Sequence, residues 1–295
     1  MQHLLMMENA LAASAHDMQH RWSSKAAPWL VHTGAQGKTV FFADWILSPG
    51  ATGKGNFLNG LRGGIRPASP AEWMEWTQLL FNKGMALDTL LSLSNRYGIK
   101  PLSLWIMLPY CYEQQERVRL KALLEWAGTV RSLWVKRFGL SGHRLEGFVW
   151  GREAIPDGDI QLVQAFNEWV RNCGLNTMWL ANYGSTHVQE WNRIGFTHVS
   201  IFSNYTGKGP YTKQWLDAAM SYAIIHHMGL QSVYGAGLRF EESSHGDYLN
   251  AVASYRLSGG EGPVVHRFIP CSRGEVPGPS SPIYEAMYRT VHGGG

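Results

Sequence analysis

The sequence contains few cysteines and few charged residues. Its 295 residues include three cysteines, Cys111, Cys173 and Cys271. An odd number without a CxxC pair excludes a disulfide framework and leaves free thiols as the simplest interpretation. Charged residues make up 16% of the chain, and the net charge of +4 includes no basic run. Nucleic-acid binding is therefore not indicated.

Long apolar runs are also missing. No stretch approaches the roughly 20 apolar residues that a membrane-spanning helix needs. Residues 1–8 have no basic segment and too short an apolar run for a signal peptide. A secreted protein without its leader would begin in the same way. The location is therefore left open, extracellular or periplasmic if a leader was removed and otherwise cytoplasmic, and the oligomeric state is open as well.

Apolar and aromatic residues are abundant instead. Apolar residues make up 45% of the chain, which has 13 Trp, 12 Tyr and 11 Phe. This composition is typical of a globular protein with a large core. The length suits one barrel of roughly 250 residues with insertions, and no Pro/Gly/Ser linker divides the chain. We therefore expect residues 1–295 to form a single domain.

Short apolar runs alternate with helical stretches along the whole chain. This alternation predicts an α/β fold, specifically a single (β/α)8 TIM barrel, in which the parallel strands are buried on both faces. The predicted strands are His3–Glu8, Thr39–Leu47, Leu102–Pro109, Leu145–Glu153, Asn176–Ala181, His198–Ser203, a run within Gln231–Phe240, and Pro263–Ile269.

Helix signals occupy the segments between these runs. A long Gly-rich loop, residues 48–70, follows the second run, and Ser69, Pro70 and Glu72 then form the pattern of a capping box with proline at the first helical position. The other predicted helices cover approximately residues 113–138, 157–173, 211–228, 247–255 and 282–292, with a short one at Trp191.

The fourth run ends in a carboxylate. Glu153 follows Trp150 and Gly151, and barrel active sites lie at the carboxyl ends of the strands. Glycoside hydrolysis needs two carboxyl groups, one of which donates a proton to the leaving group. We expect Glu153 to be this general acid and Arg152 to point away from it, because side chains alternate along a strand. The simpler alternative is an exposed glutamate in a solvated salt bridge.

The second carboxyl group is less clearly indicated. Glu241 and Glu242 follow the seventh run and are the first candidates for the nucleophile or base. Asp44 near the end of the second run and Glu8 at the end of the first are the reserves. A solvated loop pair would equally explain Glu241 and Glu242, and a buried ion pair would explain Asp44.

Polar and aromatic residues that follow other strands are candidates for substrate binding. Hydroxyl and amide groups suit sugar hydroxyls, while loop packing and Asx turns are the structural alternative. His266 and Arg267 in the eighth run could bind an anionic group, although a lone histidine is more often a core residue. The candidate substrate-binding residues are Asp44, Tyr110, Trp150, Arg152, Asn182, Tyr183, Asn204, Tyr205 and His266.

Sequence motifs that would indicate other kinds of chemistry are absent or incomplete. The Gly-rich residues 50–55 lack the spacing of a phosphate-binding loop, and there is no HExxH or G-x-S-x-G motif. His226 and His227 are adjacent and cannot bind one metal from a helix face. We expect no cofactor and no metal. A metal-dependent hydrolase that uses Asp44, Glu153 and His266 is kept as an alternative.

Several segments together resemble a known family. The chain is similar to a bacterial family of barrels catalogued as a domain of unknown function, number forty-eight fifty-five, whose members resemble glycoside hydrolases. The resemblance covers nearly the whole chain and implies a TIM barrel that acts on carbohydrate. The segments that carry it are Val40–Leu47, Leu104–Tyr110, Glu146–Glu153, Met178–Tyr183, Trp191–Phe196 and Tyr284–Tyr288.

The chain departs from the family pattern at two strands. The family's fourth strand ends in His-Glu, whereas Arg152-Glu153 stands here. The family tends to carry acidic residues along the seventh strand, where Gly237 and Arg239 stand here.

The overall interpretation is a glycoside hydrolase that uses two carboxyl groups and acts on a polysaccharide or oligosaccharide. The alternatives are a non-catalytic carbohydrate-binding barrel and the metal-dependent hydrolase.

Overall fold

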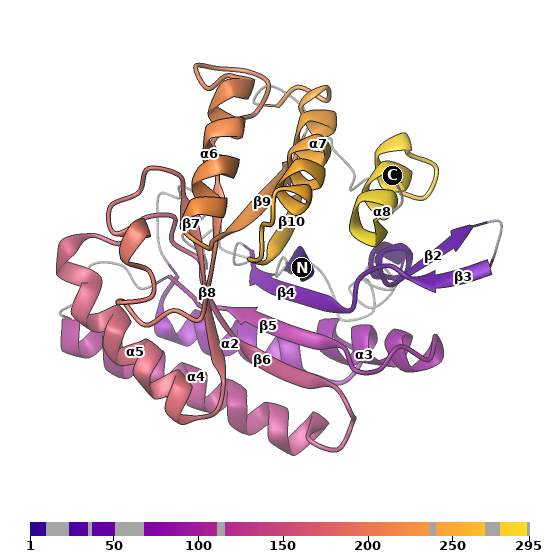
Figure 1. Cartoon of the computed structure of the whole chain (residues 1–295). Coiled ribbons are helices and arrows are strands. Elements are labelled where there is room, and N and C mark those ends of the chain that lie inside the picture. Colours follow the sequence, from indigo (N-terminus) through magenta and orange to yellow (C-terminus); the bar gives the residue numbers. More distant parts are fainter. Residues whose placement is uncertain are drawn as a thin grey trace.

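Parallel strands close into one barrel with helices outside it. The computed structural model describes residues 1–9, 24–34, 37–50, 68–110, 116–235, 240–268 and 278–293. The strand order around the closed barrel is β1-β10-β9-β8-β7-β6-β5-β4, which confirms the predicted (β/α)8 fold. These strands are β1 (His3–Asn9), β4 (Asp44–Pro49), β5 (Ser103–Met107), β6 (Arg144–Trp150), β7 (Asn176–Asn182), β8 (His198–Phe202), β9 (Gly229–Tyr234) and β10 (Val264–Phe268) (Figure 1).

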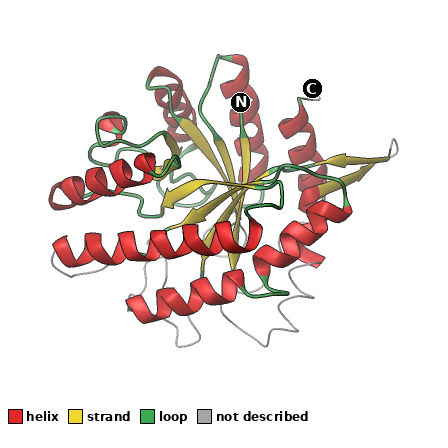
Figure 2. Cartoon of the chain, turned by 90° about the horizontal axis from the view of Figure 1, so that it is seen from below, coloured by secondary structure: helices red, strands yellow, loops and turns green. Residues whose placement is uncertain are grey.

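Helices surround the strands, as Figure 2 shows. The capping box predicted at Ser69 is present, because its hydroxyl accepts from the Glu72 N–H while the Glu72 carboxylate accepts from the Ser69 N–H. None of the described helices is long and apolar enough to span a membrane. They are residues 24–30, α2 (Pro70–Phe81), α3 (Ala86–Arg96), α4 (Glu116–Phe138), η1 (Asp157–Asp159), α5 (Ile160–Asn172), η2 (Val188–Glu190), α6 (Lys213–Ile225), α7 (Ser244–Leu257) and α8 (Pro282–His292).

The second predicted strand is wrong in its extent. Its first residues belong to β3 (Gly37–Val40), which pairs with β2 (Val31–Gly34) as an antiparallel hairpin outside the barrel (Figure 1). Backbone hydrogen bonds from Phe41 to Leu30 and from Phe42 to Trp29 continue this pairing. The barrel strand β4 then begins at Asp44. The apolar residues 40–43 connect the end of β3 to β4, so the sequence pattern did not reveal the boundary between hairpin and barrel strand.

Side chains alternate between the inside of the barrel and the layer beneath the helices. A separate apolar cluster fills the barrel and consists of Leu4, Met6, Ile46, Trp105, Met107, Val149, Met178, Leu180 and Val265. A larger cluster, which includes Trp45, Phe148, Trp150 and Trp179, joins the strands to the helices. The strand register therefore determines which residues can reach the mouth of the barrel.

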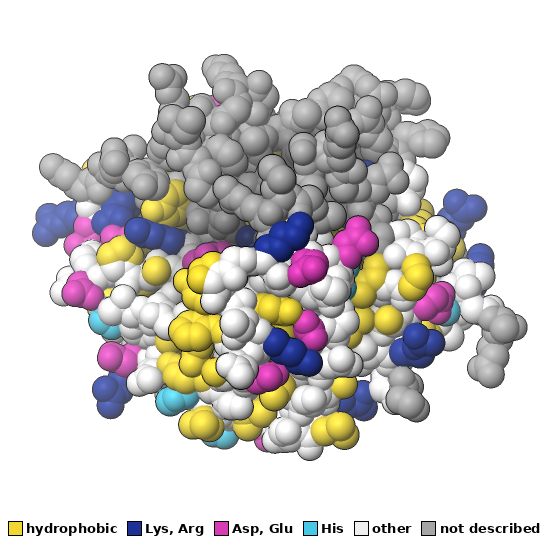
Figure 3. Space-filling model, turned by 90° about the horizontal axis from the view of Figure 1, so that it is seen from above, with side chains coloured by type: hydrophobic (Ala, Val, Ile, Leu, Met, Phe, Trp, Pro, Cys, Tyr) yellow, Lys and Arg dark blue, Asp and Glu magenta, His cyan; other side chains and the backbone are white. Residues whose placement is uncertain are grey.

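The described surface carries mixed charges. On the face drawn in Figure 3, Lys and Arg side chains lie among Asp and Glu side chains and do not form a region of one sign. This agrees with the small net charge of +4.

Candidate functional site

Glu153 lies at the carboxyl-terminal mouth of the barrel, three residues beyond the end of β6. Its carboxylate accepts from Arg267 Nη1 at 3.4 Å and from Asn182 Nδ2 at 3.5 Å. Its backbone oxygen accepts from the Asn182 N–H at 2.9 Å and from the Ser185 hydroxyl at 2.7 Å. The backbone bonds fix the loop against the end of β7, and the carboxylate remains 29% exposed.

Arg267 reaches Glu153 from the opposite side of the barrel. Three strands separate β10 from β6 in either direction around the closed sheet, so their ion pair spans the mouth. Arg267 shares its side of β10 with Val265 of the inner cluster, and only 7% of its side chain is exposed. The Phe202 ring lies 6.0 Å from the guanidinium carbon. A buried arginine needs a partner for its charge, and Glu153 supplies one.

Two amides complete this group. Asn182 ends β7 and Asn204 follows β8, and each donates to the side-chain oxygen of the other at 2.6 Å. Asn204 has φ of 62°, a conformation that asparagine tolerates better than most residues. The structure thus brings together Glu153, Asn182 and Asn204 from the predicted set, with Arg267 beside them.

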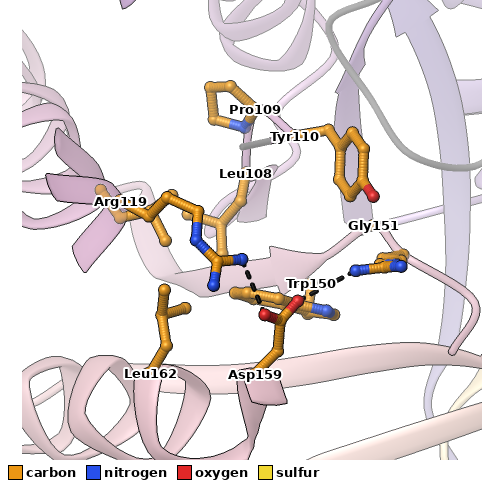
Figure 4. Close-up of a pocket in the computed structure, with 10 residues that line it drawn as sticks. Leu108, Pro109, Tyr110, Arg119, Trp150, Gly151, Asp159 and Leu162 are labelled. Carbon is orange, nitrogen blue, oxygen red and sulfur yellow. Dashed lines mark hydrogen bonds and ion pairs between the residues drawn. The ribbon is translucent and has the colours of Figure 1, made fainter. Parts of the chain in front are cut away.

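Arg152 points away from Glu153, as predicted. Its Nη1 donates to Asp159 Oδ2 at 2.9 Å, and its guanidinium group lies 5.4 Å from the centre of the Tyr110 ring. Trp150, two residues earlier at the end of β6, belongs to the outer cluster. Tyr110, Trp150 and Arg152 therefore line a pocket between the barrel wall and α4 and α5, outside the barrel (Figure 4).

The other two aromatic candidates, Tyr183 and Tyr205, lie elsewhere and do not line this pocket. Tyr183 packs against Trp215 and Tyr222 of α6. Tyr205 donates to Asp247 of α7 at 2.6 Å. Burial and this hydrogen bond raise the pKa of Tyr205 to about 12. Contacts with the helices determine where both side chains point. Their positions after strand ends in the sequence give no information about these contacts.

Asp44 and His266 do not reach the mouth. Asp44 begins β4 rather than ending its strand, so it lies at the opposite end of the barrel, where it accepts from Gln2 at 2.8 Å. Burial raises its pKa. His266 is fully buried in the outer layer between His3 and Tyr234, and burial lowers its pKa well below the usual value.

The metal-dependent alternative fails for the same reason. Asp44, Glu153 and His266 lie at different ends or faces of the barrel wall and cannot bind one ion. Among the residues that the structure describes, no group of three or more His, Cys, Asp or Glu side chains could hold a metal.

The second carboxyl group stays a prediction. Glu241 and Glu242 are exposed and follow residues 236–239, which lie outside the described residues together with Gly237 and Arg239. The Glu241 N–H donates to the Thr206 oxygen at 2.9 Å, and its side chain lies beside Gly207, in the loop after β8. Glu8 is in β1, opposite Ser48, and its side chain is outside the described part of the chain.

Sequence reasoning missed two residues beside the candidate site. Arg119 of α4 and Asp159, before α5, line the pocket of Tyr110 and Trp150. Arg119 lies inside a helical pattern, and Asp159 lies near the start of the helix predicted over residues 157–173. One sequence feature could have indicated the contact with Asp159. Arg152 is a charged residue just after the end of an apolar strand, and Asp157 and Asp159 follow it at the start of the next helix.

Two solved structures have a similar fold. One is a GH113 β-1,4-mannanase, with a TM-score of 0.54 and 9% identity, covering 99% of this chain and 98% of that chain. The other is a fungal endo-β-N-acetylglucosaminidase from glycosyl hydrolase family 18, with a TM-score of 0.53 and 11% identity, covering 98% of this chain and 97% of that chain. At such low identity these likenesses show the fold alone.

The family comparison is more specific. No curated protein matches the chain in sequence. The model of the family described as "Domain of unknown function (DUF4855)" matches residues 108–255. This range contains β6, β7, β8 and β9 and includes Glu153, Asn182 and Asn204 of the site, but not Arg267. This match covers half of the chain and agrees with the resemblance seen in the sequence. The chain therefore belongs to the DUF4855 family.

Proposed function

We propose that this protein is a glycoside hydrolase in which Glu153 is the general acid. The observation that carries the proposal is the position of Glu153 at the carboxyl-terminal mouth of a closed barrel, in contact with Arg267 and Asn182. Barrel enzymes have their active sites at this face. A partly exposed carboxyl group there can reach a glycosidic oxygen and donate its proton.

The neighbours of Glu153 suit a carbohydrate. The Asn182 and Asn204 amides and the Arg267 guanidinium supply donors and acceptors for sugar hydroxyls. The two solved barrels of similar fold act on β-linked mannan and on N-acetylglucosamine-containing glycans, according to their names. This is an argument by analogy between folds, and it gives the first substrates to try.

Two further features are required of the mechanism. The second carboxyl group would be Glu241 or Glu242, which we propose as nucleophile or base. The contact with Arg267 also has to loosen, because a guanidinium stabilises the charged carboxylate while the acid acts in its protonated form. At 3.4 Å this contact is longer than an ordinary charge-assisted hydrogen bond, so a substrate hydroxyl can replace it.

The same ion pair favours a second candidate function. A carbohydrate-binding barrel without catalysis needs no protonated acid, and a charged Glu153 paired with Arg267 would simply accept sugar hydroxyls. The two candidates differ in whether glycosidic bonds are broken.

Reducing-end release tests the proposal. The full chain is incubated with β-1,4-mannan, N-acetylglucosamine oligosaccharides and glucuronate-containing polysaccharides, while binding is measured in parallel by affinity electrophoresis. We expect new reducing ends from at least one glycan. Retention on a glycan without any release of reducing ends would favour the binding barrel instead.

A further inference from the structure

Two exposed aromatic side chains, Tyr211 and Trp215, lie next to each other outside the barrel. They are 39% and 38% exposed, and their ring centres are 5.4 Å apart. Every other Trp, Tyr and Phe among the described residues is buried or partly buried. A single exposed apolar residue is normal on a protein surface, whereas a group of them marks a place of interaction. We call Tyr211 and Trp215 the aromatic pair.

The aromatic pair lies on the face of the barrel that carries Glu153. Tyr211 belongs to the loop between β8 and α6, and Trp215 is in the first turn of α6. Loops that lead from a strand to the following helix are at the carboxyl-terminal mouth. Helix α6 packs against β8 and β9 from the outside of the barrel (Figure 1). The pair is therefore at the outer rim of the mouth.

One short segment connects the aromatic pair to the proposed catalytic group. Asn182 contacts the backbone and the carboxylate of Glu153, and the next residue is Tyr183. The centre of the Tyr183 ring lies 5.0 Å from that of the Trp215 ring. The Tyr183 N–H donates to the Phe202 backbone oxygen at 2.8 Å, which fixes this segment against β8. A ligand that extends from Glu153 past Asn182 can therefore reach Trp215.

Neighbouring groups restrain the Trp215 ring. Tyr183 meets it edge to face at an interplanar angle of 66°, and Tyr222 contacts Tyr183 in the same manner at 69°. Aromatic rings prefer contacts of this kind. The Trp215 N–H also donates to the Thr212 backbone oxygen at 2.9 Å, which fixes the first turn of α6. A ring that is already held in place loses little conformational entropy when a ligand packs against it.

The size of the aromatic pair suits a sugar residue better than a protein partner. At exposures of 38% and 39%, the two side chains together offer roughly 100–200 Å² of surface. A stable protein interface covers about 800 Å² on each partner. A sugar ring is small and has a flat apolar face of C–H groups. Tryptophan and tyrosine match it, because each combines a flat apolar face with a polar edge.

We propose that Tyr211 and Trp215 bind a sugar residue of the glycan chain outside the barrel mouth, by stacking against its apolar face. This inference rests on the proposed function, because the glycan at Glu153 is the ligand that extends to the aromatic pair. It applies equally to a barrel that binds glycans without cleaving them. The protein should then bind long glycan chains, which reach both places, more tightly than short ones.

Affinity electrophoresis of the full chain in gels that contain soluble β-1,4-mannan or glycol chitin tests the inference. On a glycan that retains the wild type, Trp215→Ala should weaken the apparent affinity roughly fivefold or more, as for an aromatic residue central to a binding surface. Tyr211→Ala should weaken it less, and Trp215→Phe, which keeps a ring, should retain most of it. Ile225→Ala is the matched control, because Ile225 is also exposed on α6, at 70%, but ends the helix.

Quenching of tryptophan fluorescence by iodide locates the contact. Trp215 is the only exposed tryptophan among the residues that the structure describes. A bound glycan should therefore protect part of the wild-type emission from iodide. This protection should be absent in Trp215→Phe even though that variant still binds. Circular dichroism checks that each variant folds.

Retention of Trp215→Ala equal to that of the wild type, or an equal loss in Ile225→Ala, would overturn the inference. So would a wild type that neither glycan retains. A wild-type dimer that Trp215→Ala converts to a monomer in sedimentation would overturn it too, since the pair would then join two copies of the chain. The assay needs no turnover, so a protein retained through Trp215 that releases no reducing ends contradicts the proposed hydrolase alone.

Discussion

Arg152 and Glu153 are neighbours in sequence with opposite surroundings. Glu153 faces Arg267 and Asn182 at the mouth, while Arg152 faces Asp159 and Tyr110 outside the barrel wall. Strand alternation predicted this divergence from the sequence. It could not predict the partner of Glu153 on β10, because that contact joins residues 114 positions apart.

The amide pair next to Glu153 should contribute to stability. Asn182→Ala removes both 2.6 Å hydrogen bonds and leaves the Asn204 amide without its partner. We expect the free energy of unfolding in urea to fall by about 1–2 kcal/mol. Asn192→Ala, at an exposed position, should change it by less than about 0.5 kcal/mol. Equal values for the two variants would mean that the amide pair contributes nothing.

At the scale of elements, the outer faces of β1 and β10 are held together by a histidine pair. His3 Nδ1 lies 3.0 Å from His266 Nε2, and His266 Nδ1 lies 3.2 Å from the Tyr234 hydroxyl. His266 was a candidate ligand from sequence, with a core histidine as the alternative. The structure supports that alternative, because the register of β10 turns its side chain away from the barrel interior.

This pair predicts a pH dependence of stability. Burial lowers the pKa of His3 to about 4 from its ordinary 6.5. Between these values the unfolded chain binds a proton that the folded chain does not, so the free energy of unfolding should fall as the pH falls from 6.5 to 4. One such group contributes a slope of at most about 1.4 kcal/mol per pH unit.

Urea unfolding at pH 7, 6 and 5 measures this slope. The wild type should lose stability more steeply than His3→Gln, while exposed His227→Asn should follow the wild type, since 77% of that side chain is accessible. Parallel curves for the wild type and His3→Gln would contradict the assignment of the effect to this pair.

The whole molecule is built around a closed eight-stranded sheet. The barrel closes only if the backbones of neighbouring strands can approach one another closely. Eight apolar runs in the sequence identified all eight barrel strands, because each one is buried on both faces. The β2–β3 hairpin was not predicted, since the end of β3 runs directly into the apolar residues that lead to β4. The barrel strands neighbour one another in chain order. The packing of Tyr183 against α6 and of Tyr205 against α7 depends on tertiary contacts, which the sequence pattern does not reveal.

Glycine is required at one of these approaches. A Cβ at Gly147 of β6 would lie 1.9 Å from the Asn176 oxygen of β7, a backbone atom that cannot move aside. We expect Gly147→Ala to lower the free energy of unfolding by about 3 kcal/mol or more. Gly158→Ala is the control, because nothing lies within 4 Å of its added Cβ. A Gly147→Ala protein as stable as the control would show that β6 and β7 are not paired as described.

The catalytic role of Glu153 is the central claim, and the turnover of Glu153→Gln tests it most directly. The matched control is Glu146→Gln, which changes another arginine-paired carboxylate of similar exposure on the same strand, 3.0 Å from Arg144 and near the opposite end of the barrel. With a glycan that has its natural leaving group, kcat should fall roughly a hundredfold or more in Glu153→Gln, as for a lost general acid. Glycan binding should persist, and Glu146→Gln should keep the wild-type kcat. An unchanged kcat in a folded Glu153→Gln protein would contradict the account.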